Sequence, residues 1–191
     1  MSDLRPPLIS ARLELRTFAA GDLDGLFAVF GDPRVMRFVG ATRRPLDRDA
    51  LRSSQERVRA HWERHGFGPL AVVERASGRL VGEAGLQVLE AGPDIELTYT
   101  LARAFWGRGY ATEAARAVLA WGLDGLGLER IVAVAYPRNR ASRHVIEKLG
   151  MTFVGRRFCH GAELVEYELS AAGRRASSAA VLESGSPTAP L

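Results

Sequence analysis

The segment 106–113, Trp-Gly-Arg-Gly-Tyr-Ala-Thr-Glu, limits the fold more than any other part of the sequence. It stands between a predicted strand that ends near Leu101 and a predicted helix over 111–123. Small residues at 107, 109 and 111 let backbone N–H groups approach an anion, and a helix start favours a phosphate there. Arg108 adds a cation. The segment predicts a phosphate-binding turn or a tight strand-to-helix turn without a ligand. It has neither the Gly-Lys-Ser/Thr of a Walker loop nor the full dinucleotide fingerprint.

A second loop follows the short apolar strand predicted at 131–135. It reads Asn139-Arg140-Ala141-Ser142, and the chain continues to Glu-Lys-Leu-Gly-Met at 147–151. Asn139 and Ser142 are good helix caps, so one interpretation is simple helix initiation. The other is a ligand site, because both loops follow strand ends, where ligands gather in open α/β sheets.

The hydrophobic pattern predicts a fold between the α+β and α/β classes. The expected order is β-α-α-β-β-β-α-β-α-β-β, a mixed sheet of about seven strands with helices on both faces. The predicted strands cover 13–17, 70–74, 79–89, 95–101, 131–135, 151–158 and 163–169, and the predicted helices cover 22–30, 47–65, 111–123 and 142–149. Residues 1–170 are expected to form one domain. Residues 171–191 are expected to be a disordered tail, because 12 of the 16 residues from 176 onward are Ala, Ser, Gly, Pro or Thr.

Composition excludes several classes of function. The net charge is +4, yet the arginines are spread along the chain among 22 acids, whereas a nucleic-acid binder usually concentrates its basic residues. No apolar run approaches the roughly 18 residues of a membrane span. The single cysteine, Cys159, excludes an internal disulfide, and no metal site is expected. A cytoplasmic protein without nucleic-acid or membrane partners is the expectation.

Four segments together resemble the GCN5-related N-acetyltransferases, specifically the RimJ/RimL-like branch. The resemblance covers about residues 8–169, and its order and spacing are more specific than any one segment. The segments are Leu-Glu-Leu-Arg at 13–16, Asp-Pro-Arg-Val-Met-Arg-Phe at 32–38, Phe-Trp-Gly-Arg-Gly-Tyr-Ala-Thr-Glu-Ala at 105–114, and Asn139-x-x-Ser142 through Met151. The family pattern is Gln/Arg-x-x-Gly-x-Gly/Ala, in which Trp106 takes the first position and Gly109 and Ala111 match.

The resemblance implies that acetyl-CoA is the co-substrate and a primary amine the acceptor, either a protein N-terminus or a small molecule. Pyrophosphate would lie on the amides of 107–112. Pantetheine would pair with the backbone of 100–103, in a slot between two splayed strands, 95–101 and 131–135. The implied cofactor contacts are Leu101, Arg103, Trp106, Gly107, Arg108, Gly109, Tyr110, Ala111, Thr112, Asn139 and Ser142. A homodimer is also expected from the family.

Acetyl transfer needs a proton acceptor, because only a neutral amine attacks a thioester. Glu96 and Glu83 are the candidates, since both lie on strands that flank the slot, and Glu96 is favoured. The family often places a tyrosine as proton donor where this chain has Ile146, so Ser142 or Tyr136 would replace it. His160 is expected at the surface near the rim of the site. The missing tyrosine keeps open an alternative, a non-catalytic module that binds or senses acyl-CoA.

Overall fold

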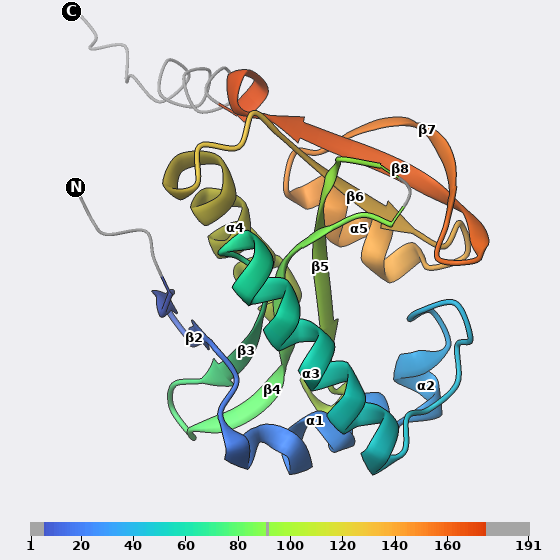
Figure 1. Ribbon diagram of the computed structural model, residues 1–191. Coiled ribbons are helices and arrows are strands. Elements are labelled where there is room, and N and C mark those ends of the chain that lie inside the picture. Colours follow the sequence, from blue (N-terminus) through green and yellow to red (C-terminus); the bar gives the residue numbers. More distant parts are fainter. Residues whose placement is uncertain (1–5, 91, 175–191) are drawn as a thin grey trace, which may run out of the picture.

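The computed structural model describes residues 6–90 and 92–174. They form one mixed sheet of eight strands, in the order β1-β2-β3-β4-β5-β6-β8-β7 (Figure 1). The strands are β1 (Leu8–Ile9), β2 (Leu13–Arg16), β3 (Pro69–Glu74), β4 (Arg79–Val88), β5 (Ile95–Leu101), β6 (Arg130–Ala135), β7 (Thr152–Cys159) and β8 (Ala162–Ser170). All neighbouring strands are antiparallel except β5 and β6.

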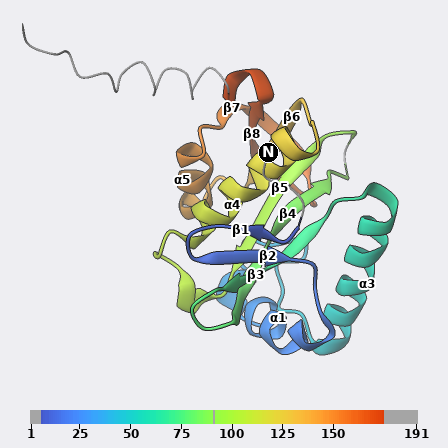
Figure 2. The ribbon, with the colours of Figure 1, turned by 90° about the vertical axis from the view of Figure 1, so that its left-hand side faces the viewer.

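Helices cover both faces of the sheet, as the sequence predicts. Helices α4 and α5 lie on one side, and α1 and α3 lie on the other (Figure 2). The helices are α1 (Leu23–Phe30), α2 (Pro33–Met36), α3 (Arg48–His65), α4 (Tyr110–Ala120) and α5 (Arg140–Lys148), with a π-helical turn at Trp121–Gly125. Asp47 caps α3 by accepting the Ala50 N–H, and Gly66 ends it in the left-handed conformation with φ 73°.

The larger hydrophobic core lies under α4. Buried side chains of β2 to β6 and β8 pack there against Ala114, Ala115 and Val118 of α4 and Ile146 of α5. Strand β6 is apolar from Ile131 to Ala135, as expected for a strand that lies between β5 and β8. A smaller core joins α1, α2 and Leu51 of α3. The strands that carry the predicted site are therefore held from both faces.

The structure differs from the sequence prediction mainly in short elements. The sheet has eight strands rather than about seven. The additional strand is β1, which contains only two residues and pairs Leu8 with Leu15. The Asp32-Pro33 pair ends α1 but also begins α2, since Asp32 accepts the N–H of Arg34. Residues 171–174 form a helical turn, inside the range predicted as tail. Residues 175–191 lie outside the described residues, so the disorder expected there stays a prediction.

Within 6–90 and 92–174, no helix combines the length and apolar character that crossing a membrane requires.

Candidate functional site

The two edges of β5 are paired very differently. On one edge, β4 pairs with β5 at seven successive positions, from Gly82 with Leu101 to Val88 with Ile95. On the other edge, the parallel strand β6 pairs at one position only, Glu96 with Val132. Beyond that point the two strands run to Leu101 and Ala135 without a ladder between them. We call this ladder-free stretch the slot; on β5 it runs from Leu97 to Leu101, and the Leu101 carbonyl already accepts the Trp106 Nε1–H.

The glycine segment lies at the open end of this slot. Gly107 and Gly109 have φ of 73° and 79°, and α4 begins immediately after Gly109. The first amide bonded within the helix is that of Glu113, which donates to the Gly109 carbonyl at 3.0 Å. The amides of Tyr110, Ala111 and Thr112 therefore precede the intrahelical ladder and point out of the helix start. Such a group of N–H donors can bind a phosphate.

Side chains around the glycine segment fix its position relative to β5. The Trp106 Nε1–H donates to the Leu101 carbonyl at 2.8 Å, while half of the Trp106 side chain is exposed. Arg103 pairs with Asp32 at 3.4 Å. The Arg108 guanidinium lies over the Phe105 ring, 5.3 Å from its centroid, and the residue is exposed. Arg108 is thus free to add positive charge beside a bound anion.

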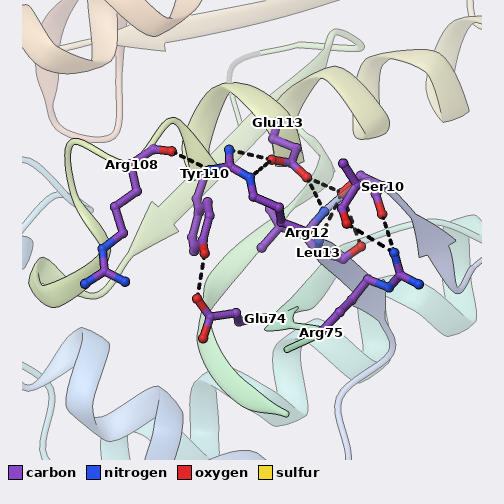
Figure 3. Close-up of polar contacts among 9 residues, drawn as sticks. Ser10, Arg12, Leu13, Glu74, Arg75, Arg108, Tyr110 and Glu113 are labelled. Carbon is purple, nitrogen blue, oxygen red and sulfur yellow. Dashed lines mark hydrogen bonds and ion pairs between the residues drawn. The ribbon is translucent and has the colours of Figure 1, made fainter. Parts of the chain in front are cut away.

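A polar network anchors the first turn of α4 to the N-terminal hairpin (Figure 3). The Glu113 carboxylate accepts the Arg12 N–H and the Ser10 hydroxyl, both at 2.8 Å, and pairs with the Arg12 guanidinium at 2.6 Å. Burial raises the pKa of Glu113, but these hydrogen bonds outweigh it, and the net pKa is lowered. Arg12 also donates to the Arg108 carbonyl at 2.9 Å. The glycine turn is therefore held from outside as well as from β5.

The α5 side of the slot carries a hydroxyl pair that the sequence analysis missed in part. Asn139 caps α5, since its Oδ1 accepts the Ser142 N–H at 3.2 Å, which confirms the capping interpretation. The Tyr99 hydroxyl from β5 lies 2.9 Å from Ser142 Oγ and 3.0 Å from its carbonyl oxygen. Burial raises the pKa of Tyr99 to about 12, so it stays protonated. Ile146 is buried in the core. The only sequence signal for Tyr99 is the alternation of side chains along β5, which places it on the face opposite Glu96.

The opposite face of β4 and β5 carries the two predicted glutamates. Glu83 lies opposite Thr100, and Glu96 lies opposite Gln87, on the face away from Tyr99. Glu83 is partly exposed on this face. Desolvation by the surrounding protein raises its pKa to about 7. Glu96 is only 5% exposed.

The Glu96 carboxylate contacts the side chains of Gln87 and His160, which bears on the predictions made for Glu96 as proton acceptor and for His160 as a surface residue. The Glu96 Oε2 accepts from Gln87 Nε2 at 2.9 Å and lies 3.0 Å from His160 Nε2. His160 is therefore not a simple surface residue, since its side chain is 21% exposed and paired with a buried carboxylate. The hydrogen bond to Glu96 raises the pKa of His160 above its ordinary value, although burial lowers it.

Tyr136 ties the end of β6 to the loop after α2. Its hydroxyl donates to the Gly40 carbonyl at 3.1 Å, and Arg43 lies over its ring at 5.6 Å. A Cβ atom placed on Gly161 would lie 3.3 Å from the Cβ of Ala41, so the β7–β8 turn touches the same loop. Loop and turn thus border the Glu96 face of the slot.

Other features of the described residues lie apart from the slot. Two surface cavities, of about 520 and 480 Å³, contain none of the predicted site residues in their linings. Across 6–90 and 92–174, no group of three or more His, Cys, Asp or Glu side chains is arranged to hold a metal ion. Cys159 is buried, and desolvation raises its pKa to about 11, so its thiol is unreactive.

Comparisons with known proteins agree with this geometry. Residues 12–152 match the family model described as an acetyltransferase (GNAT) domain. Bacillus subtilis YkkB, which is uncharacterized, is 31% identical over 149 residues, covering 76% of this chain and 85% of YkkB. The uncharacterized N-acetyltransferase YoaA of the same organism is 29% identical over 146 residues, covering 76% and 82%.

Solved structures share the fold. An acetyltransferase from Agrobacterium tumefaciens superposes with a TM-score of 0.75 and 29% identity, covering 86% of this chain and 94% of its own. RimL, an α-N-protein acetyltransferase of ribosomal L7/L12 solved with coenzyme A, gives a TM-score of 0.72 at 16% identity, covering 85% and 96%.

Proposed function

The chain belongs to the GNAT acetyltransferase family, and from this premise we propose that it transfers the acetyl group of acetyl-CoA to a primary amine. The amine would attack the thioester directly. The observation that carries the proposal is the slot between β5 and β6, which opens beside the glycine segment. Anion-binding amides at one end and an unpaired strand edge along the side suit a long ligand with a pyrophosphate.

The residues around the slot fit this co-substrate. Amides from Gly107 to Thr112 would hold the pyrophosphate, because both glycines adopt positive φ and leave the backbone uncovered. The backbone of β5 near Leu101 and the following Arg103 would bond the pantetheine arm. The Asn139 Oδ1 already accepts the Ser142 N–H. The NH₂ group of Asn139 is therefore the donor that would bond the pantetheine arm. Bound acetyl-CoA supplies an activated acetyl group and a thiol leaving group.

Glu83 and the Ser142–Tyr99 pair would handle protons on opposite faces of β5. Glu83 lies across from Thr100, beside the strand segment proposed for pantetheine, and a pKa of about 7 suits a group that takes a proton at neutral pH. Ser142 and Tyr99 are hydroxyl donors on the α5 side, where the thiol would leave. Tyr136 is a weaker candidate than at the sequence level, because its hydroxyl already donates to Gly40.

The acceptor is proposed only by class. RimL acts on a protein N-terminus and shares the fold, which supports a protein α-amine, and a small-molecule amine is the other choice. A cytoplasmic location and a homodimer stay predictions.

The test is release of free thiol from acetyl-CoA in the presence of amine probes: a short peptide with a free N-terminal α-amine, and spermidine. We expect amine-dependent release, with a Glu83→Gln variant slower by about 10²-fold or more because general bases contribute 10²–10⁴-fold. Glu14→Gln, at a partly exposed residue of β2, which β3 and β4 separate from β5, is the matched control. Acetyl-CoA binding without thiol release would contradict transfer and favour the sensing module.

A further inference from the structure

We call the face of β4 and β5 that carries Glu83 and Glu96 the acceptor face, and the proposed function gives no role to its His160–Glu96 pair. Glu96 belongs to β5 at the point where β5 and β6 still pair, and His160 belongs to the turn between β7 and β8. His160 has a φ of 49°, which is uncommon for a residue with a side chain. Gln87 from β4 completes the group by donating to the same carboxylate oxygen.

The contact fixes which ring nitrogen of His160 is available. An ionised carboxylate only accepts hydrogen bonds, so the proton of the neutral imidazole must be on Nε2, which faces Glu96 at 3.0 Å. Nδ1 then carries the lone pair. Because the His160 side chain is 21% exposed and the Glu96 side chain 6%, the ring connects a buried charge with solvent.

The stoichiometry of the reaction requires two proton transfers from the acceptor. An amine arrives as an ammonium ion with three N–H bonds, and the amide product keeps one. Two protons therefore leave the nitrogen. One balances the CoA thiol when the C–S bond breaks and the N–C bond forms, and the other is released to water. Glu83, next to the proposed pantetheine segment, can serve the transfer during attack, which leaves the first transfer without a group.

We infer that His160 accepts the first proton, from the incoming ammonium ion to Nδ1, and passes it to solvent, with Glu96 as its positioning residue. This inference rests on the proposed acetyl transfer. The neighbouring loop supports it, because Ala41 and Gly40 contact the Gly161 turn and Tyr136 and so border the same entrance. The surrounding titratable groups are consistent with it. Glu96 and Glu90 favour the charged imidazole, Cys159 stays neutral, and Arg157 pairs with Glu166 at 3.0 Å.

The pH dependence of two variants tests the inference. His160→Asn suits the positive φ, and His160→Gln keeps an amide that can still reach Glu96. With the peptide and spermidine probes, both variants should lose about 10²-fold in kcat/KM at a pH above the His160 midpoint, where the wild-type ring is neutral and the amine is still protonated, because a positioned base contributes at least that much. The loss should shrink as the pH approaches the pKa of the amine, about 8 for the peptide and near 10 for an alkylamine.

A purely structural role for His160 would give the same loss at every pH, and that result, or full activity of both variants, would overturn the inference. Calorimetric titration with acetyl-CoA should give the wild-type affinity for both variants, which separates this inference from a failure of the slot. If the wild-type protein acetylates neither probe, the proposed function fails and the inference fails with it.

Histidine NMR of the protein without acetyl-CoA gives a readout independent of activity. The His160 ring should titrate with a midpoint above its ordinary value and carry its neutral-state proton on Nε2. Glu96→Gln removes the negative charge, so the midpoint should fall, whereas Glu163→Gln on the neighbouring hairpin, which pairs with Arg156, should leave it unchanged. An unchanged midpoint in Glu96→Gln would contradict the pairing.

Discussion

The two edges of the seven-residue strand β5 differ in how completely they are paired with their neighbouring strands. Toward β4, the strand is paired at every position, and side chains on both faces are fixed by that ladder. Toward β6, it is paired once and then left open. Backbone groups in a sheet usually find partners, so the open edge of this central strand is where we propose that a ligand completes the sheet. The comparison teaches that the proposed site is a gap between strands, whose candidate side chains are held by the closed side.

The largest effect is expected where the closed side is disturbed. A Cβ on Gly82 would lie 2.2 Å from the Thr100 carbonyl oxygen, so Gly82→Ala must push β4 away from β5. We expect a loss of about 3 kcal/mol in the free energy of unfolding, at the upper end for overpacking. Gly107 on the open side has φ 73°, and a Cβ added there would meet no neighbouring atom within 4 Å, so Gly107→Ala should cost only about 1 kcal/mol, the strain of the left-handed conformation. Urea denaturation measures both, and equal losses would contradict the distinction.

A smaller effect is expected at the loop that borders the acceptor face. Tyr136→Phe removes the hydrogen bond to the Gly40 carbonyl and should lower the free energy of unfolding by about 1 kcal/mol. The loop would also be less ordered, so KM for the amine should rise while the affinity for acetyl-CoA stays the same. A change in acetyl-CoA affinity instead would show that Tyr136 belongs to the cofactor side. Tyr167→Phe, on β8 and bonded to Arg143, is the matched control.

The smallest effect concerns the polar network behind the glycine segment. Because the pKa of Glu113 is lowered in the folded protein, its contribution is complete above the unfolded pKa and is lost as the pH falls through the folded value. With Arg12 half exposed, we expect at most about 1 kcal/mol. The stability difference between wild type and Glu113→Gln should therefore shrink below about pH 4. A difference that persists at pH 3 would mean that packing, not charge, gives Glu113 its effect.

The elements with a strong local signal could be predicted from the sequence, and those that depend on a distant partner could not. The apolar run of β6 and the capped helix α3 are strong local signals, and the structure confirms both. Strand β1 has two residues and depends on its partner Leu15, so no local pattern could reveal it. The sequence prediction has no helix at 33–36, because proline disfavours a helix interior, although it also suits the first turn of a helix.

The candidate site shows the same division. The glycine segment and Asn139 are predictable because a motif requires them locally. Residues Tyr99 and His160 matter through partners 43 and 64 positions away in the chain, Ser142 and Glu96. Contacts at such separations depend on strand register and on a turn with positive φ at His160, which pattern alone does not specify.

The central claim is that the open edge of β5 and the glycine segment bind acetyl-CoA, and calorimetric titration of three proteins tests it most directly. Gly109→Glu places a negative charge where the pyrophosphate would lie. Gly127→Glu introduces the same side chain at a similar positive φ, 70° against 79°, in the exposed loop before β6, at the opposite end of α4 from the glycine segment. We predict micromolar binding by the wild type and by Gly127→Glu, and no measurable binding by a folded Gly109→Glu. Binding that survives in Gly109→Glu, or is absent from the folded wild type, would contradict the claim.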